Sequence, residues 1–124
     1  MEILTAKQEH FIRRYEEWID QVVDALMMVV QFYRDGHEEQ GDRLLTETMA
    51  GFDRFGEENM TMQSIFGENE EHLREWDFFQ QQINETLEVS TLGDPVEKIS
   101  HITKRTLPAF HRWNTVVRSL LSES

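Results

Sequence analysis

Cysteine is absent from the 124-residue chain. This excludes disulfide bonds, zinc–thiolate sites and thiol nucleophiles, and it fits a reducing compartment. Long apolar runs are missing too: the longest spans residues 25–30, far short of the roughly 20 residues that a membrane-spanning helix needs. The first residues show no basic start followed by an apolar stretch, so no secretion signal is visible. We therefore expect a cytoplasmic protein without a membrane segment.

Basic residues are scarce, because 12 Lys and Arg stand against 24 Asp and Glu and give a formal net charge of -12. Residues 35–93 hold 15 acids and three bases, whereas residues 94–124 hold three acids and five bases. Such a body repels nucleic acid and anionic lipid, so we expect neither as a partner. We expect the bases of the last segment to pair with the acidic middle. A weaker alternative is that the acidic middle mimics nucleic acid and occupies a DNA-binding protein.

Motifs of catalysis and cofactor binding are also missing. A di-metal site in a helical bundle needs Glu-x-x-His on facing helices. The residues three positions before the five histidines are Lys7, Arg34, Asn69, Lys98 and Pro108. No Gly-x-Ser-x-Gly elbow, phosphate-binding loop or calcium loop is present. We therefore expect a protein that is not an enzyme and holds no cofactor.

A looser pattern leaves a metal- or small-ligand-binding bundle as an alternative. Glu68 and His72 are four residues apart, as are Glu97 and His101, so each pair would share one helix face. The two pairs would supply four metal ligands if they faced each other across adjacent helices. Solvent-facing pairs are the more ordinary explanation in a chain with 24 acids.

What the chain does contain is apolar residues spaced alternately by three and four, which predicts amphipathic helices. The longest covers residues 6–34 and is followed by Gly36, which suits a left-handed C-terminal turn. A second covers residues 69–91. The apolar stripes of these two helices are Phe11, Tyr15, Trp18, Val22, Ala25, Val29 and Phe32, then Leu73, Trp76, Phe79, Ile83 and Leu87.

The last helix has the sharpest start. Asp94 is an N-cap, Pro95 occupies the first helical position, and Glu97 completes a capping box. The apolar spacing continues to Leu120. Pro108 lies inside this helix and predicts a kink, because proline lacks an amide donor and clashes with the preceding turn.

Residues 37–66 are harder to assign, because Gly41, Gly51 and Gly56 interrupt them. Each interior Gly costs about 1 kcal/mol relative to Ala. One continuous helix with a weak point near Gly56 is the favoured prediction. The alternative is a helix that ends at Gly56, followed by a short helix over residues 59–66. Gly51 would also allow close approach of another helix.

Short connections make neighbouring helices antiparallel. We therefore predict an all-α fold, with residues 1–124 forming a single domain and an up-down-up-down four-helix bundle.

Adjacent apolar pairs predict exposed apolar surface, since Met27 with Met28, or Phe78 with Phe79, cannot both point straight into a core. The alternative is a wide bundle face that buries both members. Methionine suits adaptable binding surfaces, and exposed apolar area marks interfaces. We expect an amphipathic segment to pack near Met27, Met28 and Phe78. Basic residues of the partner would face the acids Glu38, Glu39, Glu70 and Glu71.

In size, acidity and helical order the chain is loosely similar to bacterial flagellar export chaperones. The likeness covers the whole chain as architecture and includes no specific motif, so it assigns no binding residues. Together with the missing catalytic motifs, these features favour a non-enzymatic protein-binding bundle. A small adaptor or a chaperone-like protein fits this description, with a homodimer left open.

Overall fold

The computed structural model describes residues 4–56 and 58–123. Every regular element among them is helical, which confirms the predicted all-α class. The α-helices are α1 Ala6–Arg34, α2 Glu38–Ala50, α3 Met60–Phe66, α4 Glu70–Leu87, α5 Pro95–His101 and α6 Leu107–Glu123. Two 3-10 segments, η1 Gly51–Phe55 and η2 Val89–Thr91, and a π-helical segment, η3 Ile102–Thr106, complete the chain.

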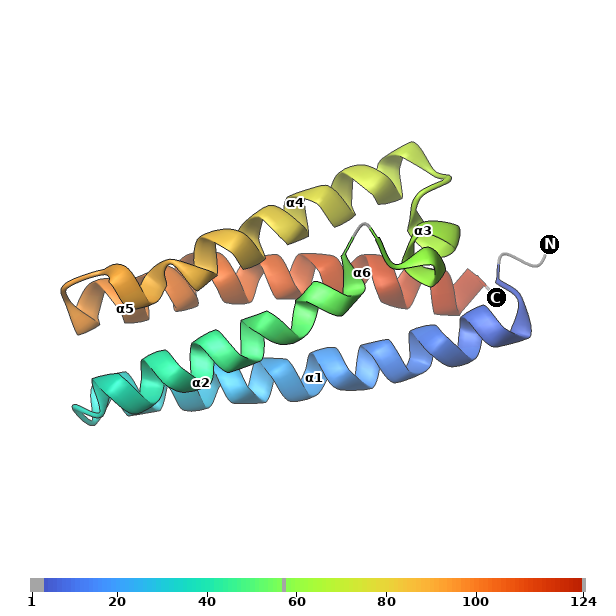
Figure 1. Cartoon of the computed structure of the whole chain (residues 1–124). Coiled ribbons are helices and arrows are strands. Elements are labelled where there is room, and N and C mark those ends of the chain that lie inside the picture. Colours follow the sequence, from blue (N-terminus) through green and yellow to red (C-terminus); the bar gives the residue numbers. More distant parts are fainter. Residues whose placement is uncertain (1–3, 57, 124) are drawn as a thin grey trace.

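The long helices lie side by side and give the molecule an elongated shape (Figure 1). α1 packs chiefly against α2 and α6, and α4 packs against α6. α1 begins and α6 ends at the same end of the molecule. α2 runs back along only part of α1, and the chain then turns away toward α3. The N-terminal half of α1 is therefore not covered by α2 (Figure 1).

α1 has strong local signals at both ends. The Thr5 side chain accepts a hydrogen bond from the Gln8 amide, and the Gln8 side chain accepts one from the Thr5 amide, which makes a capping box. After the helix, Gly36 has φ +83°, a left-handed conformation that glycine adopts without a Cβ penalty. The predicted helix over residues 6–34 is thus confirmed.

The favoured prediction of one continuous helix over residues 37–66 is wrong, and the alternative of two pieces is confirmed. α2 gives way to the 3-10 segment η1, and α3 begins after Asn59, whose side chain caps it. Tertiary contact explains the change: a Cβ on Gly51 would lie 3.1 Å from Trp18 Cζ2 on α1. Gly51 thus permits the close approach that its position suggested.

The chain stays helical through Pro108, the second residue of α6, and the irregularity there is a π-helical segment that ends just before the proline. The five residues of η3 join α5 to α6 through a π turn, in which the Leu107 amide donates to the Ile102 carbonyl. A π turn is a recognised way to accommodate an irregularity within a helix. A buried 2.8 Å hydrogen bond between the Thr86 and Thr106 hydroxyls holds η3 against α4.

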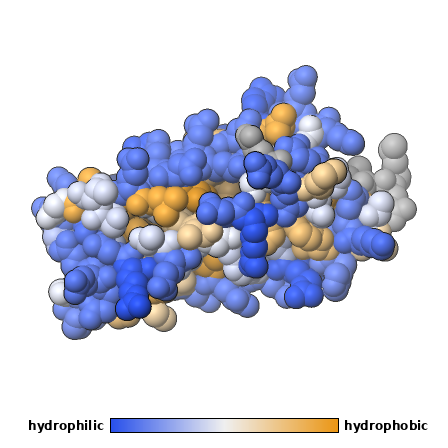
Figure 2. All heavy atoms as spheres, viewed as in Figure 1, coloured by the Kyte–Doolittle hydropathy of each residue, from blue (hydrophilic) through white to orange (hydrophobic). Residues whose placement is uncertain are grey.

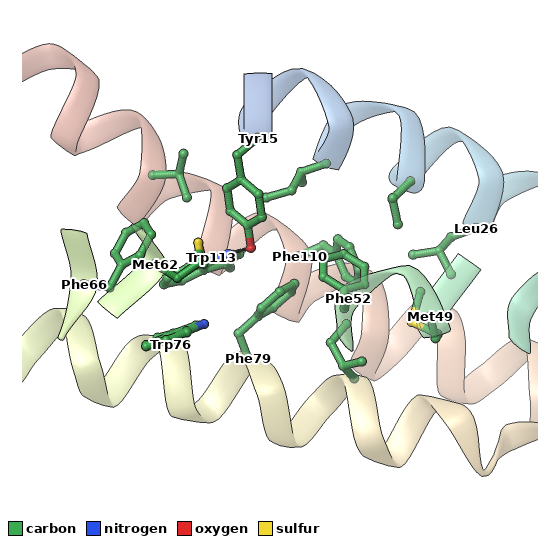
Figure 3. Close-up of a cluster of buried hydrophobic side chains, with 14 of the residues drawn as sticks. Tyr15, Leu26, Met49, Phe52, Met62, Phe66, Trp76, Phe79, Phe110 and Trp113 are labelled. Atoms are coloured by element: carbon green, nitrogen blue, oxygen red, sulfur yellow. Dashed lines mark hydrogen bonds between the residues drawn. The ribbon is translucent and has the colours of Figure 1, made fainter. Parts of the chain in front are cut away.

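Aromatic side chains fill the centre of the core (Figure 3). Phe79 of α4 stacks on Trp113 of α6, with ring centroids 5.4 Å apart. Phe52 of η1 reaches both Phe79 and Phe110 edge-on. The Trp113 indole donates a buried 2.9 Å hydrogen bond to the Tyr15 hydroxyl, which satisfies the indole N–H inside the core.

The bases of the last segment pair with acids, largely as predicted. The pairs are Lys98 with Glu38 and Asp42, Arg105 with Glu85, Arg112 with Glu75, and Arg118 with Glu16 and Asp20. Arg118 departs from the prediction, because its partners lie on α1 rather than in the acidic middle, and Lys104 forms no ion pair within the described residues.

Candidate functional site

A hollowed surface lies along α1, where α2 ends and η1 turns away. Two hollows of about 550 and 530 Å³ meet there and share Trp18, Gln21 and Arg54. We call the combined surface the α1 groove. It is lined by His10, Phe11, Arg14, Tyr15, Glu17, Trp18, Gln21, Val22, Ala25, Glu47, Thr48, Ala50, Gly51, Asp53, Arg54 and Phe55. The groove follows directly from the shortness of α2.

Half-buried aromatic rings form the floor of the α1 groove. The Phe55 ring lies 4.9 Å from that of Trp18 and 6.1 Å from that of Phe11, measured between centroids. The Arg54 guanidinium carbon lies 5.4 Å from the Trp18 centroid and 4.8 Å from the Phe55 centroid. An Arg over aromatic faces is held by cation–π attraction while its N–H donors stay available. The floor is thus apolar, with one cation at its edge.

Met27 and Met28 are both exposed, at 59% and 54%. The prediction that they cannot both enter the core is therefore confirmed, since neither does. Helical spacing puts them on different faces. Met28 follows Gln21 and Ala25 by seven and three residues, so it extends the stripe that lines the α1 groove. Met27 follows Asp20 by seven residues, on the side that faces Arg118 of α6.

Phe78 is only half-exposed. The Arg112 guanidinium carbon lies 4.2 Å from its ring centroid, and Arg112 makes two hydrogen bonds to Glu75, of 2.6 and 2.7 Å. This hydrogen bonding lowers the pKa of Glu75 despite an opposing effect of burial. Phe78 therefore already has a cover from its own chain.

The predicted acidic residues do not form one patch. Glu38 and Glu39 occupy the first turn of α2, and Glu70 and Glu71 the first turn of α4, at opposite ends of the molecule (Figure 1). Glu70 and Glu71 are exposed where the helix dipole favours acids. The structure thus separates them from Met27, Met28, Glu38 and Glu39.

The residues of the alternative metal site are also far apart. Glu68 precedes α4, whose N-cap is Asn69, and His72 lies in its first turn. Glu97 and His101 belong to α5, at the other end of α4 (Figure 1). The two pairs therefore do not face each other. Within residues 4–56 and 58–123, no three His, Asp or Glu side chains come together in a metal-binding arrangement.

Sequence reasoning missed the aromatic residues of the α1 groove. Trp18 and Phe11 fit the apolar stripe of α1 and so were assigned to the core. The available signal was the glycine pair at residues 51 and 56: a break there shortens the neighbouring helix and uncovers α1. Figure 2 shows apolar side chains between α2 and α4 and beyond the end of α2, within a largely hydrophilic surface.

The fold and the groove define an all-helical protein with an open aromatic groove along its first helix. In the part of the chain that the structure describes, no helix has both the length and the apolar character to cross a bilayer. Residues 10–116 match a family model described as Domain of unknown function (DUF8042), and the chain belongs to this family. The matched range contains the whole α1 groove. No curated protein and no solved structure matches the chain.

Proposed function

We propose that the protein is a non-enzymatic protein-binding module, a small cytoplasmic adaptor or chaperone-like protein. Its architecture would be an up-down-up-down four-helix bundle in which the second helix is broken. Its binding site would be the α1 groove, and its partner would present an amphipathic helix with a basic rim.

The observation that supports this proposal most is the uncovered aromatic floor. Trp, Tyr and Arg are the residues that dominate binding energy at interfaces. A groove along a helix suits a partner helix that anchors apolar side chains at positions i, i+3, i+4 and i+7. Because α2 stops short, such a helix would lie along the uncovered half of α1.

Charge favours a basic partner. Glu17, Glu47 and Asp53 line the groove against Arg14 and Arg54, whose guanidinium already lies over the rings. The net charge of -12 on the whole chain also attracts a cationic partner. Complementary charge raises association rates and selects partners, and added salt screens it.

A synthetic amphipathic helix of leucine and lysine is a suitable probe, with a leucine–glutamate helix of the same pattern for comparison. We expect the lysine peptide to bind, to bind more weakly at raised salt, and to shift the amide resonances of α1 and η1 in NMR spectra. The glutamate peptide should not bind.

Two matched variants locate the contact. Gln21 lies where both hollows meet, whereas Gln40 is exposed on α2 outside the groove. Gln21→Lys and Gln40→Lys change the net charge equally, but only Gln21→Lys places a cation in the groove. We expect Gln21→Lys to weaken the binding of the lysine peptide by about 1 kcal/mol, or about fivefold in affinity. Equal affinities for the two variants would contradict the proposal.

Sedimentation of the protein without peptide tests whether a second copy of the chain occupies the α1 groove. A dimer that Gln21→Lys dissociates would show that a second copy fills the groove. Equal binding of any cationic polymer, unaffected by Gln21→Lys, would favour the acidic nucleic-acid mimic instead.

A further inference from the structure

A further hollow lies between η1 and α4, and its lining shares Tyr15, Asp53 and Phe55 with that of the α1 groove. Its volume is about 120 Å³, and it is lined by Tyr15, Phe52, Asp53, Phe55, Gly56, Trp76, Phe79, Gln80, Ile83 and Asn84. Five of these ten residues are aromatic. Exposed Asp53 and Asn84 stand at its opening. We call it the η1 cavity. We propose that it binds a small, neutral, planar aromatic molecule that carries a carboxamide or similar carbonyl group.

Size supports a one-ring ligand. An engineered protein cavity of about 150 Å³ with apolar walls stays dry and binds benzene. The η1 cavity is slightly smaller but opens to solvent beside η1. Its walls are rings in edge contact, such as Phe52 and Phe79 with centroids 5.5 Å apart. Such walls present both ring faces and ring edges, which favours a planar aromatic guest.

Two polar groups of the lining residues lack a complete set of partners. The side-chain nitrogen of Gln80 is buried and makes no hydrogen bond within the described residues. The Tyr15 hydroxyl accepts from Trp113, and no acceptor for its own proton is recorded in that part of the chain. Figure 3 shows this hydroxyl directed into the aromatic cluster. Buried donors without partners are rare in proteins and call for a specific explanation. A ligand acceptor atom would satisfy one of them.

The chemistry of the opening selects a neutral carboxamide. A carboxamide presents a carbonyl oxygen and an NH2 group side by side, so it can pair with the Gln80 amide in either orientation. Its remaining N–H can donate to the Asp53 carboxylate at the opening. A carboxylate ligand would meet Asp53 and the net charge of -12, and would be disfavoured.

Benzamide is the probe we would use, titrated into the uniformly nitrogen-labelled protein and followed by NMR. We expect saturable shifts of the Trp76 indole and the Gln80 side-chain amide, with a dissociation constant on the order of 1 mM for so small a ligand. Benzoate should bind more weakly. Gln80→Leu should weaken the binding of benzamide about fivefold by removing one hydrogen bond.

Gln81→Leu is the matched control, since Gln81 is the adjacent residue, is exposed and does not line the cavity. Equal benzamide affinities for Gln80→Leu and Gln81→Leu would overturn the proposal, as would the absence of a saturable shift at Trp76. Shifts confined to Trp18 would also overturn it, because they would place the ligand in the α1 groove. None of these results would bear on the binding of the lysine peptide, so the two proposals fail separately.

Discussion

Lys98 is the least expected side chain in the core, since only 1% of the residue is exposed. Its ammonium lies 2.8 Å from Glu38 and 3.0 Å from both carboxylate oxygens of Asp42. Tyr33 donates a 2.7 Å hydrogen bond to the same Asp42 carboxylate. Burial alone would lower the pKa of Lys98, but the hydrogen bonds and charges of Glu38 and Asp42 outweigh it and raise the pKa. The network ties α5 to both α1 and α2.

The two sides of this ion pair should respond differently to mutation. Asp42→Asn leaves a buried ammonium with one carboxylate partner, and we expect it to cost about 3 kcal/mol. Lys98→Met leaves carboxylates that water still reaches, because the Glu38 and Asp42 side chains are 40% and 27% exposed. We expect Lys98→Met to lower the free energy of unfolding by about 1 kcal/mol. Urea denaturation monitored by circular dichroism measures both.

Arg43→Met is the control, since the Arg43–Glu47 pair is exposed and should contribute less than about 0.5 kcal/mol. A larger loss of stability for Lys98→Met than for Asp42→Asn would contradict the argument that the buried ammonium is the group that costs most when it loses its partner.

At the element scale, the contact of α1 with α2 depends on Gly41. A Cβ at this position would lie 2.6 Å from Cε1 of Tyr33, a buried ring that its bond to Asp42 holds in place. Ala normally stabilises a helix interior by about 1 kcal/mol relative to Gly. Here the clash should prevail, because a buried ring in a close-packed core cannot move without disturbing its neighbours.

We therefore predict that Gly41→Ala destabilises the protein by about 2 kcal/mol, measured by thermal and urea denaturation. Gly93→Ala is the control, since nothing lies within 4 Å of the added Cβ and no change of this size should follow. A stabilised Gly41→Ala variant would mean that α1 and α2 separate easily.

The elements were predictable where a signal is local. The Asp94–Pro95 start was predicted from neighbouring residues alone, and the Asp94 side chain caps α5 by accepting a hydrogen bond from the Val96 amide. The 3-10 geometry of η1 was not predictable, because it depends on where Trp18 of α1 lies in space. The same is true of η3, since Pro108 signals an irregularity but does not determine whether the helix bends, breaks or widens.

At the scale of the whole molecule, ionisable groups define a window of maximal stability. Burial and the positive charge of Arg105 lower the pKa of His101 from its usual 6.5. The negative charge of Glu85 acts in the opposite direction but is outweighed. The unfolded chain therefore takes up this proton first, and stability falls as the pH drops below about 6.5. Burial raises the pKa of Tyr15 and of Tyr33 above the usual 10.0, and the pKa of Lys98 is raised too.

In the alkaline range the unfolded chain loses these protons first, so stability is complete below about pH 10 and falls above it. We predict a plateau in the urea midpoint between about pH 7 and pH 10. His101→Gln should flatten the decline between pH 6.5 and pH 5. A midpoint that rises above pH 10 would be incompatible with buried, protonated tyrosines.

The candidate site was less predictable than the fold. The adjacency of Met27 and Met28 predicted that they could not both point into the core, but the relation of Met28 to the groove needed the position of η1. Trp18 belongs to the predicted apolar stripe of residues 6–34, but such a stripe does not reveal which part of it lacks a covering helix. The charge pairs were predictable in kind, although the burial of Lys98 was not.

The three tryptophans occupy three different surroundings. Trp18 is half-exposed in the α1 groove, Trp76 borders the η1 cavity, and Trp113 is sealed in the core by its bond to Tyr15. Variants that each retain a single tryptophan would give the molecule three separate fluorescent reporters, one for each compartment. Peptide docking, ligand entry and loss of the core would then appear as three distinguishable optical signals from the same small protein.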